Sequence, residues 1–85
     1  MVSETSIEAY NSIINQLGLR QMQVYEAIKR LGEADNLSIS KHLNLPINCV
    51  TGRVNELRKD GLIELAMIEK SIHTGRRVSY WRVKV

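Results

Sequence analysis

The feature that most constrains this chain is a change in hydrophobic period at Gly61. Before this glycine, Val50, Val54 and Leu57 stand at positions i, i+4 and i+7, which places three apolar side chains on one stripe of a helix. From Ile63 onward, apolar residues recur at every second position, which is typical of a strand. Glycine enters the left-handed conformation at a helix end without steric penalty. The sequence therefore predicts an amphipathic helix that ends at Gly61 and leads directly into a strand.

The face opposite this apolar stripe is small and polar. It consists of amide, hydroxyl and glycine positions and one cation: Asn48, Thr51, Gly52, Asn55 and Lys59. A helix with such a surface fits a groove about 12 Å wide, such as the major groove of DNA. We therefore interpret residues from about 47 to 60 as a recognition helix that the rest of the chain presents.

Charge is distributed unevenly along the chain. Residues 1–40 hold three Lys/Arg against five Asp/Glu, a net charge of −2, whereas residues 41–85 hold nine against four, a net charge of +5. The basic half also contains the expected recognition helix. Such an asymmetry is typical of a surface that faces phosphates, and chance clustering on a solvated surface is the alternative.

Size and composition narrow the class of protein. Eighty-five residues form one domain with a modest core, which leaves little volume for an enclosed active site. An apolar content of 44% is enough for a folded domain, and no apolar run is long enough to cross a membrane. Cys49 has no second cysteine to pair with, which fits a reducing compartment. We expect a cytoplasmic protein that is associated with the nucleoid when bound to DNA.

The sequence offers no constellation for catalysis or metal binding. It has no pattern of paired carboxylates, Ser/His/Asp residues or clustered metal ligands. His42 and His73 are too few, and too far from Cys49 in sequence, to indicate a metal site. We therefore expect no enzyme activity, metal, cofactor or small-molecule ligand.

A first helix is expected at the N-terminus. Ser3 or Thr5 is a suitable cap, and Gly18 breaks the helix. Its apolar stripe has helical spacing and comprises Ile7, Tyr10, Ile13, Ile14 and Leu17. The stripe suits packing on the rest of the domain as well as pairing with its copy in a homodimer, and the sequence leaves both open. We assign residues 1–18 to this extension and residues 19–85 to the main domain.

Two further helices precede the recognition helix. The first spans residues 19–31, ends at Gly32 and has on its apolar stripe Met22, Val24, Tyr25, Ala27, Ile28 and Leu31. The second has Asn36 as its N-cap, runs through Ile39 and Leu43, and ends at Asn44, which tolerates the left-handed conformation.

The connection between the second of these helices and the recognition helix is short. Leu45 is expected to be a buried plug between the helices, and Pro46 stands where the recognition helix begins, where its missing N–H costs nothing. Two short helices joined by a tight turn, the second of them amphipathic, make a helix-turn-helix.

The last third of the chain reads as a β-hairpin. Ile63, Leu65 and Met67 alternate with other residues in the first run, and Gly75 supplies the turn. The second run has the same alternation at Trp81, Val83 and Val85. An isolated hairpin is marginal in water, so we expect this one to pack on the helices through Leu65, Trp81 and Val83.

Three stretches resemble the winged helix-turn-helix family. Residues 38–46 (Ser-Ile-Ser-Lys-His-Leu-Asn-Leu-Pro) resemble its positioning helix and turn. Residues 50–63, which end in Gly-Leu-Ile, resemble its recognition helix and the exit into the wing, and residues 76–83 resemble the returning wing strand. The resemblance covers residues 19–85. It implies an α+β fold, with a three-helix core, an additional N-terminal helix and a C-terminal β-hairpin wing.

The resemblance also implies double-stranded DNA as the partner, with the helix in the major groove and the wing, residues 71–77, on the backbone or in the minor groove. The residues that would then face bases are Asn48, Thr51, Gly52 and Asn55. An amide pairs with adenine, and the threonine methyl can touch a thymine. The residues that would contact phosphates or the minor groove are Lys41, His42, Arg53, Arg58, Lys59, Arg76 and Arg77. The central outward positions lack arginine, so the common guanine contact is not expected.

Two functions from different classes follow from these patterns. The first is a small transcriptional regulator that binds DNA, alone or as a homodimer. The second is a winged-helix module for protein interaction, which needs exposed apolar side chains such as Ile47, Ile68 and Ile72. A Z-DNA-type winged helix is disfavoured, because Asn55 stands where that family has a tyrosine.

Overall fold

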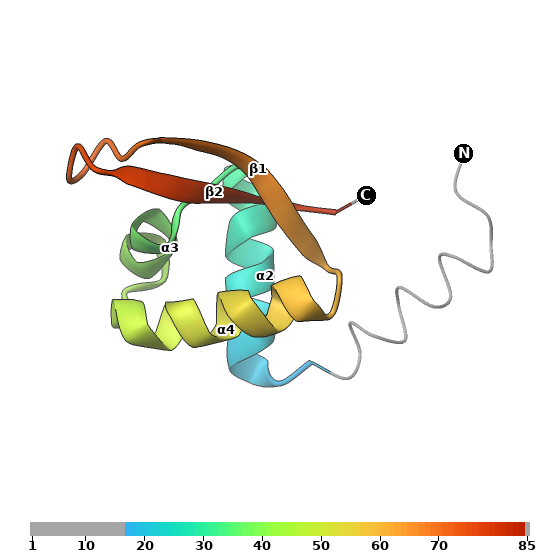
Figure 1. The fold of residues 1–85 in the computed structure, drawn as a ribbon. Coiled ribbons are helices and arrows are strands. Elements are labelled where there is room, and N and C mark those ends of the chain that lie inside the picture. The colour runs from blue at the N-terminus through green and yellow to red at the C-terminus, as the bar shows by residue number, and fades with distance from the viewer. Residues whose placement is uncertain (1–16, 85) are drawn as a thin grey trace.

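The structure is a computed structural model that describes residues 17–84. Its elements are helices α2 (Leu19–Leu31), α3 (Asn36–Leu43) and α4 (Ile47–Lys59), followed by strands β1 (Ile63–Lys70) and β2 (Arg77–Val83) (Figure 1). The expected N-terminal helix falls on residues before 17, outside the described part of the chain. The α+β fold of three helices and a C-terminal hairpin is confirmed.

A single apolar core joins the three helices and the hairpin. It is formed by Val24, Tyr25, Ala27, Ile28, Ala34, Ile39, Val50, Val54, Leu57, Leu62, Ile63 and Trp81. The buried stripe of α4 is the expected one, but α2 differs at its end, where Leu31, the last helical residue, is exposed. Leu45, expected to be a buried plug, is half-buried and packs against the edge of this core.

Backbone conformations at the helix ends explain the boundaries. Asn44 has φ 55° and ends α3, and Gly61 has φ 76° just beyond α4, as the sequence predicts. The start of α3 corrects an expectation. Asp35 is its N-cap, because its backbone is extended and its Oδ1 accepts from the N–H of Ser38 at 3.0 Å. Asn36 is instead the first helical residue.

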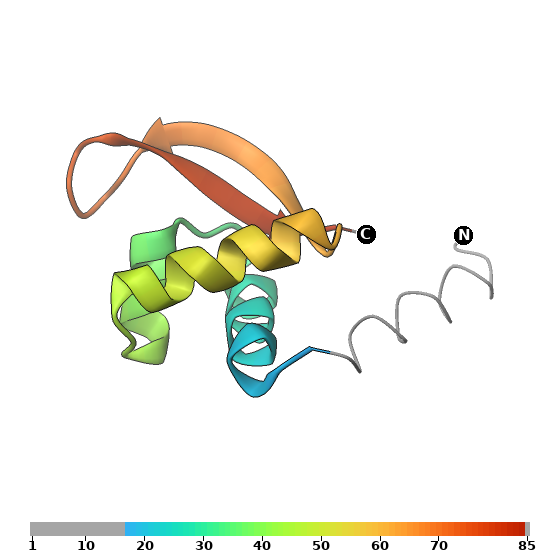
Figure 2. The same ribbon diagram turned by 60° about the horizontal axis from the view of Figure 1, so that its bottom comes forward.

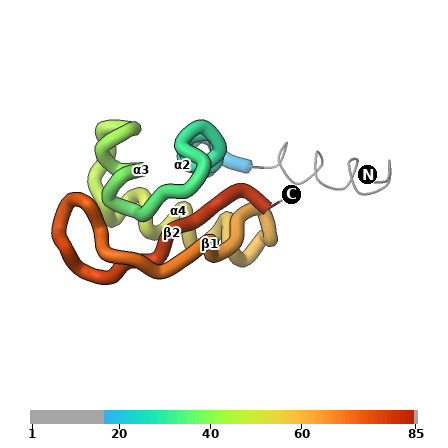
Figure 3. Tube along the Cα trace, turned by 90° about the horizontal axis from the view of Figure 1, so that it is seen from above, coloured from blue at the N-terminus to red at the C-terminus, as the bar shows by residue number. Residues whose placement is uncertain are grey.

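The hairpin is tied to the helical layer through β2. Trp81 exchanges two backbone hydrogen bonds with Ala34, which precedes α3, at 2.8 and 3.0 Å. The strand therefore lies between β1 on one side and this bridge on the other. Figure 2 shows α4 running beneath the hairpin, with its first turn near the hairpin loop and its last turn leading to β1. Seen from above, the loop reaches the side of α3 (Figure 3).

A β-bulge interrupts the expected alternation of β1. Leu65 pairs with Trp81 and Met67 with Tyr80, which leaves Ala66 without a partner in the ladder. Because Tyr80 and Trp81 are adjacent on β2, they point to opposite faces, and so do Leu65 and Met67. The expectation that Leu65 packs on the helices is wrong, because its side chain is 47% exposed. The other two expected contacts are present, since Trp81 lies in the core and Val83 packs against it.

Candidate nucleic-acid interface

The outward face of α4 carries the residues expected to contact bases. Asn48, Thr51 and Asn55 are exposed, and Gly52 is half-buried beside them. A Cβ atom at Gly52 would meet nothing within 4 Å, so no contact within residues 17–84 requires glycine there. The structure thus brings all four positions together on one accessible surface, opposite the buried stripe of the helix.

The three polar side chains on this face differ in their hydrogen bonds. Asn55 has no partner within the described residues. Asn48 accepts from the backbone N–H of Cys49 at 3.1 Å through its Oδ1, which leaves both hydrogens of its amide available. The hydroxyl of Thr51 donates to the carbonyl of Ile47 at 3.0 Å. Asn48 and Asn55 therefore present donors to an approaching ligand, whereas the proton of Thr51 is engaged.

The cations of α4 lie in different surroundings. Lys59 is exposed and has no ion-pair partner among residues 17–84. Arg58 lies over the ring of Trp81, with its guanidinium carbon 5.5 Å from the ring centroid. Arg53 forms an ion pair with Glu56 on the half-buried flank of the helix, about 200° around from Asn55. The structure therefore places Lys59 and Arg58 near the polar face and Arg53 away from it.

The two expected contacts of α3 point in different directions. Lys41 Nζ lies 3.3 Å from Nδ1 of His73 in the hairpin loop. His42 instead borders the groove between α2 and α3, together with Met22 and Glu26. Lys41 thus joins the side of the molecule on which the hairpin loop lies, and the structure does not bring His42 there.

The hairpin loop, residues 71–76, is folded back on the N-terminal half of α3. It is closed by a hydrogen bond from the N–H of Ser71 to the carbonyl of Arg76 at 2.8 Å, and Gly75 has φ 73° in its turn. The hydroxyl of Ser71 donates to Oδ2 of Asp35 at 3.3 Å, and both residues are buried. His73 also contacts the hydroxyl of Ser38 at 3.3 Å through its Nε2. These bonds hold the loop in place.

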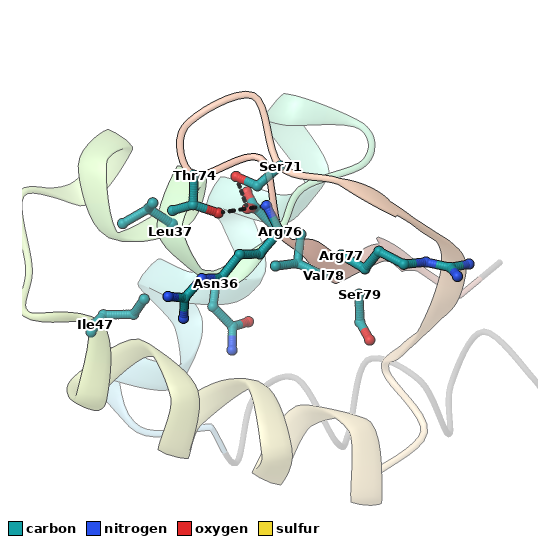
Figure 4. A pocket seen from close by; sticks show the side chains of 10 residues that line it. Asn36, Leu37, Ile47, Ser71, Thr74, Arg76, Arg77, Val78 and Ser79 are labelled. Atoms are coloured by element: carbon teal, nitrogen blue, oxygen red, sulfur yellow. Dashed lines mark hydrogen bonds between the residues drawn. The ribbon is translucent and has the colours of Figure 1, made fainter.

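A hollow of about 430 Å³ separates the hairpin from the first turns of α3 and α4. Its walls include Ile47 of α4, Asn36 of α3 and both expected wing arginines. Figure 4 shows Arg76 directed toward Ile47, whereas Arg77 is directed away from it. Neither guanidinium has a hydrogen-bond partner within residues 17–84. One free cation, that of Arg76, therefore borders the hollow beside the start of α4, and the free cation of Arg77 points away from it.

An amide connects the hairpin to α4. Nε1 of Trp81 donates to Oδ1 of Asn36 at 3.2 Å, and Nδ2 of Asn36 donates to the hydroxyl of Thr51 at 3.4 Å. Sequence reasoning treated Asn36 as a cap and missed this role, as it missed Asp35, Ser38 and Ser71. An aspartate just before the first helical residue does signal the cap at Asp35, but no pattern marks bonds to residues far along the chain.

The described residues contain no cluster of three or more side chains that could hold a metal ion. No helix among them is long and apolar enough to cross a membrane. The chain matches no protein-family model and no curated protein sequence.

Solved structures with low sequence identity share the fold. A possible transcriptional regulator from Methanosarcina mazei Go1 superposes with a TM-score of 0.69 at 16% identity, over 93% of this chain and 66% of that one. The reduced form of MarR from Escherichia coli gives 0.65 at 14% identity, over 99% and 67%. The transcriptional regulator PA4135 gives 0.61 at 23% identity, also over 99% and 67%.

This chain thus spans about two thirds of the length of each of these structures. At such identities the likeness establishes the architecture, and the expected resemblance is confirmed at that level. The described residues form a winged helix-turn-helix domain, in which α3 and α4 are the helix-turn-helix and the hairpin is the wing.

Proposed function

We propose that this chain is the DNA-binding domain of a transcriptional regulator. One observation carries the proposal. The unpartnered guanidinium group of Arg76 borders the same hollow as the first turn of α4, whose polar face is open, and Arg77 adds a second unpartnered guanidinium at the start of β2. A winged helix with cations and free amides on one side is suited to a duplex, which offers phosphates and base edges together. Two of the similar structures carry names that agree with this proposal, one as a possible transcriptional regulator and one as a transcriptional regulator.

In the proposed complex, α4 enters the major groove with its exposed face toward the base edges. Asn55 and Asn48 are the proposed readers of adenine, because an amide can donate to N7 and accept from N6 of that base. Gly52 lies between them and allows the helix backbone to approach the bases closely. Specificity then comes from amides rather than from arginine–guanine pairs.

Phosphate contacts are proposed for the cations around this face. Lys59 and Arg58 lie at the C-terminal end of α4, and Arg76 and Arg77 lie on the wing. Lys41, beside His73 of the hairpin loop (the wing loop), is a further proposed phosphate contact. Of the other expected contacts, Arg53 would have to leave Glu56, and His42 borders a different groove, so neither is part of the proposed interface.

Selection from a random duplex pool at two salt concentrations, followed by sequencing of the bound fraction, tests the function. We expect an enriched motif, and an affinity whose logarithm falls by about 0.9 per phosphate contact for each tenfold rise in salt. The result that contradicts the proposal is the absence of binding even at low salt. A motif made of two inverted half-sites indicates a dimer, because operator symmetry mirrors protein symmetry.

A homodimer through residues 1–18 is proposed for the assembly, on the basis of their apolar stripe. Light scattering of the full chain and of a chain without these residues tests it. We expect the mass of a dimer for the full chain and the mass of a monomer for the truncated chain. An unchanged mass means that these residues are not the sole interface.

Exposed apolar side chains favour a second candidate function, a protein-interaction module. Ile72 on the wing loop is 87% exposed and Ile68 on β1 is 50% exposed. Apolar groups in such positions are suited to a protein partner. The selection experiment distinguishes the two functions, since only the first requires DNA binding that weakens as salt rises.

A further inference from the structure

The side chain of Thr51 has a fixed orientation on the proposed DNA-facing helix. A hydroxyl carries one donor and two acceptor positions. The donor of Thr51 is engaged by the carbonyl of Ile47 one turn earlier, at 3.0 Å. One acceptor position is taken by Nδ2 of Asn36 at 3.4 Å. The polar edge of this residue is therefore turned toward the protein.

The amide of Asn36 makes two hydrogen bonds, one to the Thr51 hydroxyl and one to Trp81. Its Oδ1 accepts from the indole N–H of Trp81 at 3.2 Å, so the amide is held from both sides. Figure 4 shows the Asn36 side chain directed toward α4. Trp81 itself is buried and paired with Ala34, which anchors the amide to the sheet.

What Thr51 offers to the groove is its methyl group. The residue is exposed, yet its hydroxyl proton is already donated, so it cannot donate to a base without breaking a bond within the helix. Ile47 lies one turn earlier on the same side of α4 and is 47% exposed. The two side chains form a small apolar surface beside the open amides of Asn48 and Asn55.

We propose that Thr51 recognises the C5-methyl group of a pyrimidine in the major groove, and that Asn36 is the positioning residue that keeps the hydroxyl turned away. The inference deepens the proposed function and rests on it. The C5-methyl of thymine is displayed in the major groove, where an apolar group can contact it. A 5-methylcytosine carries the same methyl at the same place, so the shared ligand is a methylated pyrimidine.

The test uses the full chain and the duplex motif from the selection experiment. Each thymine of the motif is replaced in turn by uracil, which removes only the methyl. We expect the affinity of the wild type to fall about fourfold when the thymine at one particular position is replaced. This is the loss expected for one buried methyl group. Methylation of cytosine at each motif C·G pair is the parallel arm. A loss of affinity with uracil identifies thymine as the recognised base. A gain of affinity with 5-methylcytosine identifies the methylated cytosine instead.

Two substitutions at Thr51 connect the effect to the protein. Thr51→Ser keeps the hydroxyl and lacks the methyl, so it should bind the methylated and unmethylated duplexes equally. We call the ratio of the affinities for the methylated and the unmethylated duplex the methyl factor. Thr51→Val keeps a methyl and lacks the hydroxyl, so it should retain the methyl factor of the wild type. The inference is overturned if neither arm shows a methyl effect, or if the effect is the same in the serine variant. Complete failure of the wild type to bind DNA instead contradicts the proposed function.

Asn36→Asp tests the positioning residue. Aspartate still accepts from Trp81 but, when ionised, cannot donate to Thr51. We expect the methyl factor to shrink toward one in this variant, whatever happens to overall affinity. In the double variant Asn36→Asp/Thr51→Val the factor should return, because valine has no hydroxyl to orient. A methyl factor that Asn36→Asp leaves unchanged would show that Asn36 supports the fold without orienting Thr51.

Discussion

The α4 helix and the hairpin loop, residues 71–76, are held in place by opposite kinds of contact. The α4 helix is fixed by a buried apolar stripe, and its outer face makes few bonds to the rest of the domain. In the hairpin loop only Ser71 is buried. The loop is held by polar contacts from Ser71 and His73 to residues 35–41. The helix therefore owes its position to the core as a whole, and the loop owes its position to a few specific side chains.

The two parts of the proposed DNA surface therefore differ in how readily they open. A packed core moves as a unit, because its side chains interlock at near-crystalline density. A loop held by single hydrogen bonds, each worth about 1 kcal/mol, opens locally without unfolding the domain. We therefore expect α4 to be rigid before DNA arrives and the wing loop to open more readily.

The largest expected effect is on the helix side. Leu57 is fully buried in the stripe of α4. Leu57→Ala should lower the free energy of unfolding by about 2–5 kcal/mol, from lost transfer energy and a residual cavity. Urea denaturation measures the change, with the exposed Leu19→Ala as a matched control that should cost far less. A loss below about 1 kcal/mol would mean that the core does not hold α4.

The next effect is on the wing side. Asp35 is 1% exposed and accepts from both Ser38 and Ser71. Asp35→Ala should cost about 2 kcal/mol, from the lost N-cap and the buried hydroxyl of Ser71 left without its acceptor. Hydrogen exchange should accelerate in residues 71–76 more than in α4. The exposed neighbour Glu33 supplies the control, since Glu33→Ala removes no such bond, and equal acceleration throughout would contradict a locally held loop.

The same difference explains what the sequence could predict. The limits of α2 and α4 follow from apolar spacing and from Gly32 and Gly61, because these signals are local. The wing contacts join positions 32 to 36 residues apart and are polar, so they leave no period in the sequence. The alternation in β1 could not reveal the bulge at Ala66, because apolar residues keep to every second position from Ile63 to Met67 although the pairing shifts by one residue there.

Of the proposed interface, the α4 face was predictable and the arrangement around it was not. Helical geometry alone placed Asn48, Thr51 and Asn55 on one surface. The folded domain selects the rotamers of its side chains. These rotamers decide that Arg53 forms an ion pair with Glu56 and that Asn36 donates to Thr51.

A third prediction concerns the free cations of the wing. Arg76→Ala with Arg77→Ala should leave the free energy of unfolding within about 0.5 kcal/mol, because the wild-type guanidinium groups have no partner within residues 17–84. Affinity for duplex DNA should fall about tenfold or more, across all sequences, and the salt slope should decrease by about 2. Arg30→Ala, on the exposed side of α2, is the matched control. Unchanged affinity in the double variant would remove the wing from the proposed interface.

The smallest expected effect is that of Gly52→Ala. Measured by unfolding and by DNA binding, it tests the stability of α4 and its proposed contact with DNA separately. Gly52 has open space where a Cβ would stand, and glycine costs a helix about 1 kcal/mol relative to alanine. Gly52→Ala should therefore stabilise the domain by about that amount, measured by urea denaturation. If α4 approaches bases closely, the same variant should bind its selected motif more weakly, since the added methyl would stand in the open space through which the helix backbone approaches the bases. A variant that is more stable and binds equally well would show that the helix lies too far from the bases for glycine to matter there.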